Sequence, residues 1–465
     1  MKFKTTLTLL AVFALLLAVV LFFDSKAGKK EAAEEKANTL VDVASADVRK
    51  VTLARGGETL TLERDEAGPW RLVSPVQAAA DDYEAGALVD ALSSLRIERV
   101  VETEAKDPAA YGIPAMEASL WVKGQDAPVR LLVGMENPLD KSLFAQRGDD
   151  PRVVLLASSL KTTLDKTVFD FRQKDVFKFT TADVRTVKVR AGAVVWQAAR
   201  RDGGWFLESP VAALAAGGRI DALLDSLSGI RAKEFVAEEK GPGVLEKYGL
   251  AEPGYEIALS LPAAAQEIVF GLHGDGEAAY ATTSLSTKVV AFDGTTLLAD
   301  LARKVDELRE KKVSDFYAWD ARRISVKRAG LELVAVREKA GEEDKWHLEP
   351  APKEEADRAK VEGLIRKIEG LEAASFIDDP GPPAAYGLDA ATEIRILTRD
   401  YQDQEKETVL LVGGEDAEKK QVVVRNALFD YLFRVDSAFL RDLPGDRKEW
   451  LPQPPQTDEG PADKK

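Results

Sequence analysis

The sequence predicts an α+β protein: three tandem repeats of a mostly antiparallel sheet-plus-helix domain, placed after an N-terminal transmembrane helix. Two observations support this prediction. A pattern that begins with tryptophan recurs without gaps at residues 70–101, 205–236 and 346–377, and an uncharged apolar segment occupies residues 7–23. The repeat period is near 137 residues. A period this long indicates tandem domains rather than a solenoid of short repeats.

An amphipathic helix forms the centre of each repeat. Apolar residues recur 18, 22 and 25 positions after each tryptophan, and in the first repeat they are Leu88, Leu92 and Leu95. This is the i, i+4, i+7 spacing of one helix face. Asp81 and Asp357 precede the helix where an N-cap is expected, although a catalytic carboxylate is the alternative. The second repeat has Ala216 at the aligned position.

Alternating apolar residues on both sides of this helix predict strands. In the first repeat, three strands are expected between Val48 and Leu72, separated by glycine-containing turns. Further strands are expected after Tyr111-Gly112, up to Val153–Leu156, and a short helix follows at Leu160. Strands, helix, strands and helix with short connections predict antiparallel sheet with helices packed on one face.

The domain boundaries follow from the repeat. The predicted segments are a cytoplasmic flank (1–6), a transmembrane anchor (7–23), a stalk (24–46), three repeat domains (47–178, 179–315 and 316–444) and a disordered tail (445–465). A motif that contains Arg172 in one copy and Arg309 in the other occurs twice. Because three domains need two junctions, we expect it to be a rigid connector in which the two arginines have equivalent structural roles.

The N-terminal segment predicts a membrane anchor. The uncharged stretch of residues 5–23 would form about 28 Å of helix, close to the thickness of a bilayer core. A cleaved signal peptide is the alternative, but Asp24-Ser25-Lys26 offers no small-x-small cleavage site. Lys2 and Lys4 favour a cytoplasmic N-terminus, while lysines just beyond the span compete. We expect the C-terminal domains in the periplasm, outside a bacterial inner membrane.

Composition excludes several classes of function. The net charge of −15 argues against nucleic acid as a partner, because phosphate binding needs a clustered positive surface. The chain has no cysteine, which removes disulfides, thiolate metal sites and cysteine nucleophiles. Its two histidines are His273, expected in a glycine-rich surface loop, and His347, expected to point outward from a strand. We therefore predict no catalytic, cofactor-binding or metal-binding residues, and no cofactor.

The recurring aromatic residues have two interpretations. Trp70, Trp205 and Trp346 could stack on sugars, but each lies in an alternating strand that faces the helix stripe, which favours core packing. Each repeat also contains a Tyr-Gly pair, at Tyr111-Gly112, Tyr248-Gly249 and Tyr386-Gly387. We interpret each pair as a glycine-assisted turn with the tyrosine at the domain edge, and a ligand contact is the alternative.

Two groups of carboxylates follow the main helices. They are Glu102 and Glu104 in the first repeat, and Asp378-Asp379 in the third. Such groups could pair as acid and base in a hydrolase. Solvated acidic loops are the simpler interpretation, since the sequence does not bring two of these groups together.

The sequence resembles a bacterial family. The shared features are the N-terminal anchor, the W-x-L-x-x-P or W-x-L-x-P step, the Tyr-Gly-Leu motif at residues 248–250 and 386–388, and the L-R-x-K-x-V junction. This is domain-of-unknown-function family 4340 (DUF4340), a family of membrane-anchored envelope proteins often encoded beside gliding-motility-type ABC transporter subunits. The first repeat departs from the motif, with Ile113 after Tyr111-Gly112. The resemblance supplies no catalytic residues.

Together these observations predict a non-enzymatic, single-pass envelope protein. The expected role is an accessory or scaffold subunit of an ABC-type transport assembly, whose partner would be the transporter permease or an associated subunit. A glycan or peptidoglycan binding module that uses the recurring tryptophans is one alternative. A hydrolase built on Glu102, Glu104, Asp378 and Asp379 is another.

Overall fold

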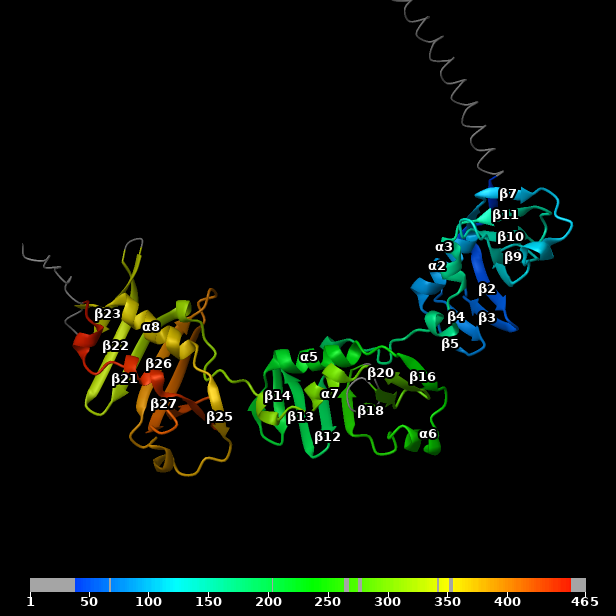
Figure 1. Cartoon of the computed structure of the whole chain (residues 1–465). Coiled ribbons are helices and arrows are strands. Elements are labelled where there is room, and N and C mark those ends of the chain that lie inside the picture. The colour runs from blue at the N-terminus through cyan, green and yellow to red at the C-terminus, as the bar shows by residue number, and fades with distance from the viewer. Residues whose placement is uncertain are drawn as a thin grey trace, which may run out of the picture. The chain divides into compact units, whose positions relative to one another are not determined.

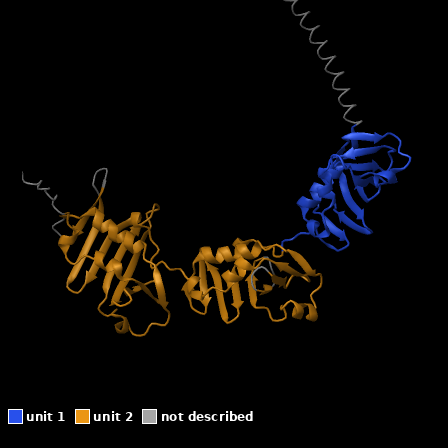
Figure 2. Ribbon diagram, in the orientation of Figure 1, with its two compact units in different colours: residues 1–175 blue, residues 176–465 orange. Residues whose placement is uncertain are grey.

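The computed structural model describes residues 38–452, except 67, 203, 263–266, 275–277, 341–342 and 351–353. The chain divides into two compact units, residues 1–175 and 176–465 (Figure 2). The first unit contains one nine-stranded sheet and the second contains two. The predicted anchor at residues 7–23 lies outside the described residues. In the part of the chain that is described, no helix is both long enough and apolar enough to span a bilayer.

The three sheets share one antiparallel topology. Four strands run from the centre of the sheet to one edge, and the main helix follows. The next strand of the sheet crosses to the opposite edge, and four more strands then fill the space between the centre and that edge. In the first repeat a short strand at Ser94–Arg96 comes before this crossing and pairs with Thr39–Asp42 in a separate two-stranded sheet. The strand orders are β5-β4-β3-β2-β8-β9-β10-β11-β7, β15-β14-β13-β12-β17-β18-β19-β20-β16 and β24-β23-β22-β21-β26-β27-β28-β29-β25.

The element bounds show the same succession in each repeat. The first repeat contains β1 (Thr39–Asp42), β2 (Val48–Arg55), β3 (Glu58–Glu63), β4 (Arg71–Ser74), β5 (Ala78–Ala79), α2 (Asp82–Ser93), β6 (Ser94–Arg96), β7 (Arg99–Glu102), β8 (Met116–Val122), β9 (Val129–Glu136), β10 (Leu143–Arg147), β11 (Val153–Leu156), α3 (Ser159–Leu164) and α4 (Val168–Phe171). The second contains β12 (Thr186–Ala191), β13 (Val194–Arg201), β14 (Gly204–Ser209), β15 (Ala213–Leu214), α5 (Gly217–Ser228), β16 (Glu234–Ala237), α6 (Pro242–Lys247), β17 (Tyr255–Ser260), β18 (Ile268–Gly274), β19 (Ala279–Thr283), β20 (Val289–Phe292) and α7 (Thr295–Leu301). The third contains β21 (Ala321–Arg328), β22 (Leu331–Ala340), β23 (Glu343–Glu349), β24 (Glu354–Glu355), α8 (Arg358–Glu369), β25 (Ala373–Ile377), β26 (Thr392–Arg399), β27 (Glu405–Asp416), β28 (Gln421–Asn426) and β29 (Leu432–Asp436).

Each main helix packs its apolar stripe onto its own sheet. In α2 the predicted stripe residues Leu88 and Leu92 are buried in one cluster with strand residues such as Val51 and Leu62. Figure 1 shows α2, α5 and α8 each on one face of a sheet. The predicted antiparallel sheet with helices on one face is therefore confirmed. The repeats are nevertheless richer in strand than predicted, because each has nine strands in its sheet and one helix of 12 residues.

The described chain extends the first and third repeats beyond their predicted limits. Residues 38–46 were expected to belong to the stalk, but β1 pairs with β6, and Leu40 and Val41 are buried in the first core. Residues 445–452 were expected to be disordered, but a 3₁₀ helix spans Arg447–Trp450, and Trp450 is buried in the third core. Both assignments were wrong because these short segments carry too few apolar residues to reveal a periodicity.

The Tyr-Gly turn and a strand glycine approach each other closely in two of the repeats. Gly112 and Gly387 have φ values of 72° and 67°, which residues with a side chain rarely adopt. A β-carbon at Gly134 would meet the Tyr111 carbonyl oxygen, and one at Gly413 would meet that of Tyr386. Two motifs that recur separately in the sequence are thus the two sides of one backbone contact.

This contact predicts opposite outcomes for two glycine substitutions in the third repeat. Gly413→Ala is expected to reduce the free energy of unfolding by about 1–3 kcal/mol, because the added methyl group overpacks against backbone. Gly363→Ala lies inside α8 and would meet no heavy atom within 4 Å, so a gain of about 1 kcal/mol is expected from helix propensity. Urea denaturation of both variants is the measurement. Equal effects of the two substitutions would contradict the close approach at Gly413.

Candidate functional site

The three recurring tryptophans are core residues. Trp70, Trp205 and Trp346 are at most 4% exposed. The predicted core packing is confirmed, and sugar stacking on these rings is excluded because neither ring face is accessible. The tryptophan indoles are instead part of a polar framework that holds the main helix to the sheet.

In the second repeat this framework is an arginine, a tryptophan and a carboxylate. The Arg200 guanidinium lies 4.6 Å from the Trp205 ring centroid. The Trp205 indole Nε1–H and an Arg200 terminal N–H each donate to one oxygen of Asp221 at 2.8 Å. Asp221 belongs to α5, so the cluster fixes the helix against the strands. Together these contacts satisfy the buried indole N–H and stack a cation on the ring.

The other repeats keep parts of the same cluster. In the third, the Trp346 indole donates to Glu362 of α8 at 3.3 Å. In the first, Arg64 lies 4.6 Å from the Trp70 ring, and burial is the main cause that lowers the pKa of this arginine. The recurrence at one place in each repeat argues for a structural role of the cluster.

The acidic residues before the main helices are caps. Asp81 accepts hydrogen bonds from the backbone N–H groups of Tyr83 and Glu84, at 3.2 and 3.3 Å. Asp357 accepts one from Lys360 N–H at 3.2 Å. The predicted capping is therefore confirmed, and these carboxylates satisfy helix N–H groups that would otherwise lack partners. Ala216 provides no side-chain cap for α5.

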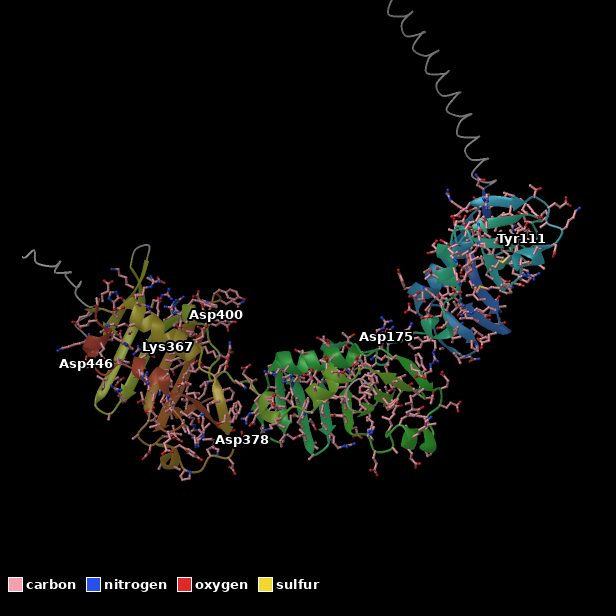
Figure 3. All side chains as sticks on the ribbon, viewed as in Figure 1. Tyr111, Asp175, Lys367, Asp378, Asp400 and Asp446 are labelled. Atoms are coloured by element: carbon pink, nitrogen blue, oxygen red, sulfur yellow. The ribbon has the colours of Figure 1, made fainter. Side chains whose placement is uncertain are left out.

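Two of the carboxylates considered for catalysis have structural partners. Glu102 accepts a hydrogen bond from the Tyr111 hydroxyl at 2.6 Å, and this bond raises the pKa of Tyr111. Asp378, which is labelled in Figure 3, directly follows β25 and pairs with Arg309. Glu104 and Asp379 are exposed. The structure therefore gives Glu102 and Asp378 a role in holding loops to the sheets.

The two histidines lie on strands. His273 is exposed on β18 rather than in the predicted loop, and its ring packs against Gly249 of the Tyr-Gly turn. His347 is half-buried on β23, between buried Trp346 and Leu348, which agrees with the predicted alternation. Among the residues that the structure describes, no three His, Asp or Glu side chains gather as metal ligands would.

One exposed carboxylate has a strongly lowered pKa. Hydrogen bonds from the Thr295 hydroxyl and backbone N–H, together with Lys233 at 3.1 Å, lower the pKa of Asp293 to about 2. Because the folded-state pKa of Asp293 lies below the ordinary value of 3.8, its ionised carboxylate stabilises the folded protein above pH 3.8. This stabilisation is lost as the pH falls toward about 2.

Thr295→Ala is accordingly expected to raise the pKa of Asp293 toward its ordinary value. Asp293→Asn is expected to reduce the pH dependence of stability in this same acidic range. A carboxyl-carbon NMR titration of the native protein and of Thr295→Ala would check the shift. An unchanged titration midpoint in Thr295→Ala would contradict the assigned cause.

The connector that contains Arg309 joins two repeats of the second unit through backbone pairing. Arg309 bridges Ala215, next to β15, and Lys312 bridges Glu372, next to β25. The equivalent Arg172 bridges Ala80 in the first unit. Both arginines are buried, as expected for equivalent structural roles. The connector is thus an extended segment that hydrogen-bonds to the repeat before it and, at Arg309–Lys312, to the repeat after it.

The Arg309 side chain fills an aromatic cage in the third repeat. Its guanidinium carbon lies 3.7 Å from the Phe376 ring centroid and 4.5 Å from that of Tyr431. One terminal nitrogen contacts Asp378 at 2.5 Å and lies 3.7 Å from Asp306. The side chain is fully buried, and its Nε makes no hydrogen bond within the described residues. Burial of this kind is costly unless packing and charge pairing compensate.

A polar cleft beside α8 was not predicted. Its volume is about 280 Å³, and it is lined by Ala318, Trp319, Arg337, Arg358, Glu362, Arg366 and Glu369. Two exposed aromatic residues lie here: Trp319 belongs to the 3₁₀ helix Ala318–Asp320 that precedes β21, and Tyr317 is the N-cap of that helix. Sequence comparison of the repeats could have found this pair, because the positions aligned with Trp319 hold Ala46 and Ala182.

The fold and these clusters define a tandem-repeat protein built from three copies of one antiparallel sheet domain. A family model described as Domain of unknown function (DUF4340) matches residues 70–206 and 205–391. Because these regions cover more than half of the chain, the protein belongs to this family. The first match runs from Trp70 to just past Trp205, and the second runs from Trp205 beyond Trp346. No curated protein and no solved structure matches the chain.

Proposed function

We propose that this protein is a non-enzymatic scaffold or accessory subunit of an ABC-type transport assembly in a bacterial envelope. It is held at the inner membrane by residues 7–23, with its repeats in the periplasm. The apolar N-terminal segment and the family resemblance support this location and partner. The partner would be the transporter permease or a subunit associated with it.

The observation that carries the scaffold proposal is the connector of the second unit. Its backbone pairs with Ala215 on one side and Glu372 on the other, and its arginine is buried against the next repeat. A scaffold needs such a fixed joint, because a partner that contacts two repeats gains affinity when their arrangement is already ordered. The carboxylates Glu102 and Asp378, which a hydrolase would need, have structural partners instead.

Purification from native membranes tests the proposal. The full chain is extracted in mild detergent, cross-linked and analysed by mass spectrometry, and a stoichiometric ABC permease is the expected partner. The matched control is a chain in which residues 7–23 are replaced by a cleavable secretion signal. Recovery of the native chain without any transporter subunit, or fractionation of the native chain with soluble proteins, would contradict the proposal.

A further inference from the structure

The third repeat presents a stacked pair of exposed aromatic rings. The Tyr317 and Trp319 ring centroids lie 4.4 Å apart with an interplanar angle of 12°. The two residues are nevertheless 56% and 65% exposed. Because Tyr317 covers one face of the indole, an exposure this high leaves the other face of Trp319 open to solvent. The stacking also orders the indole, so less conformational entropy is lost when a ligand binds.

The cleft beside Trp319 offers both hydrogen-bond donors and acceptors. Arg358 and Arg366 present N–H groups, and Glu362 and Glu369 present carboxylate oxygens. These side chains are partly held in place, since Arg358 donates to Glu362 at 2.9 Å and Glu362 also accepts the Trp346 indole N–H. Such anchoring favours a preformed site over a solvated surface.

The charges at this cleft are balanced. Arg337 donates to the Trp319 carbonyl oxygen at 2.9 Å and forms an ion pair with Asp344 at 3.0 Å. The other two arginines of the lining face two glutamates. A balanced site does not select a strongly charged ligand. It suits a neutral molecule with many hydroxyl groups, because each hydroxyl both donates and accepts hydrogen bonds.

Comparison of the repeats shows that the fold does not require these residues. The positions of Tyr317 and Trp319 are Ala44 and Ala46 in the first repeat, and Thr180 and Ala182 in the second. The positions of Arg358 and Arg366 are aspartates, Asp82 and Asp90, in the first repeat, and Gly217 and Asp225 in the second. The same sheet and helix form in all three cases. The aromatic pair and its arginines therefore belong to the third repeat alone.

We propose that this cleft is a binding site for a neutral saccharide. One sugar ring packs its C–H face on the open face of Trp319. Its hydroxyl groups accept hydrogen bonds from Arg358 and Arg366 and donate to Glu369. A cleft of about 280 Å³ is near the lower end of the size of small-molecule sites, which fits one sugar unit of a longer chain. This inference does not depend on the transport assignment.

Calorimetric titration of the full chain with neutral tetrasaccharides tests the site. The probes are tetrasaccharides of β-1,4-linked glucose and of β-1,4-linked N-acetylglucosamine, and the detergent must carry no sugar headgroup. At least one probe is expected to bind at millimolar concentration. Trp319→Ala is expected to weaken binding about tenfold or more, since it removes the stacking surface. Trp319→Phe is expected to retain part of the affinity.

The matched control is Tyr401→Ala. Tyr401 is another exposed aromatic residue of the third repeat, 92% exposed, and it is not part of the cleft lining. Its replacement is expected to leave saccharide binding unchanged. The absence of binding by both probes would overturn the proposal, as would equal losses in Trp319→Ala and Tyr401→Ala. Tyrosine, tryptophan and arginine also dominate protein interfaces. The saccharide proposal would therefore also be overturned if the native chain bound no saccharide but cross-linked to a protein partner, and Trp319→Ala abolished that cross-link.

Discussion

Replacing Trp450 by alanine is expected to lower the free energy of unfolding of the third repeat by about 3–5 kcal/mol. The indole is 2% exposed and belongs to the core that contains Trp346 and Leu364. Its carbonyl oxygen also accepts the backbone N–H of Asp357, the cap of α8, at 2.7 Å. The substitution leaves a cavity beside the main helix. Urea denaturation of the purified chain, followed by circular dichroism, is the measurement.

The control for this prediction is Trp319→Ala, which removes the same ring from the surface of the same repeat. This substitution is expected to change the free energy of unfolding by less than about 0.5 kcal/mol. Truncation provides a second test, since a chain that ends at Pro444 should lose as much stability as Trp450→Ala or more, and one that ends at Pro452 should lose little. If truncation at Pro444 has no effect, residues 445–452 are not part of the folded repeat.

Removing the partner of the buried Arg309 is expected to lower the free energy of unfolding more than replacing Arg309 itself. Asp378→Ala leaves a fully buried guanidinium with one distant carboxylate, Asp306. We expect the free energy of unfolding to fall by about 2–3 kcal/mol. This is less than the cost of breaking a fully buried pair, because Asp378 is 38% exposed. Arg309→Met fills the same cage between Phe376 and Tyr431 without a charge. It is expected to cost less than Asp378→Ala.

Asp379→Ala is the matched control for Asp378→Ala. Asp379 is the next residue, it is exposed, and its removal is expected to change the free energy of unfolding by less than about 0.5 kcal/mol. Chemical denaturation of the three variants in one buffer gives the comparison. If Asp378→Ala and Asp379→Ala were equal, the Arg309 contact would contribute nothing to the fold.

The sequence repeat was sufficient to predict the sheet-and-helix unit. Each repeat forms the same kind of core, so the apolar helix residues and the buried tryptophan recur at the same offsets. Leu88, Leu223 and Leu364 are all buried as their shared offset predicts. The far edge strands β7, β16 and β25 were not predicted as strands. All but one of their side chains are exposed or half-buried, and they show no clear alternation. Burial, not strand formation itself, generates the pattern that sequence analysis detects.

The same reasoning explains why the core residue Trp450 and the exposed pair Tyr317 and Trp319 were missed. Trp450 takes the place of Phe171 and Leu308, whose carbonyl oxygens accept the equivalent helix N–H, but Pro444-Gly445 ends the visible similarity between the repeats. Tyr317 and Trp319 were overlooked for the opposite reason. A search for residues shared by the repeats finds the framework of the fold, whereas this pair distinguishes one repeat from the others.

The connectors have a consequence for how three similar sheets coexist in one chain. An open strand edge can recruit another strand, and neighbouring copies of one domain are prone to such mispairing. Here the edge strands β5, β15 and β24 have two residues each, and the connector bridges Ala80 and Ala215 directly after the first two of them. The segment that links one domain to the next therefore also pairs with one edge of the sheet before it, which leaves less of that edge open to mispairing with another strand.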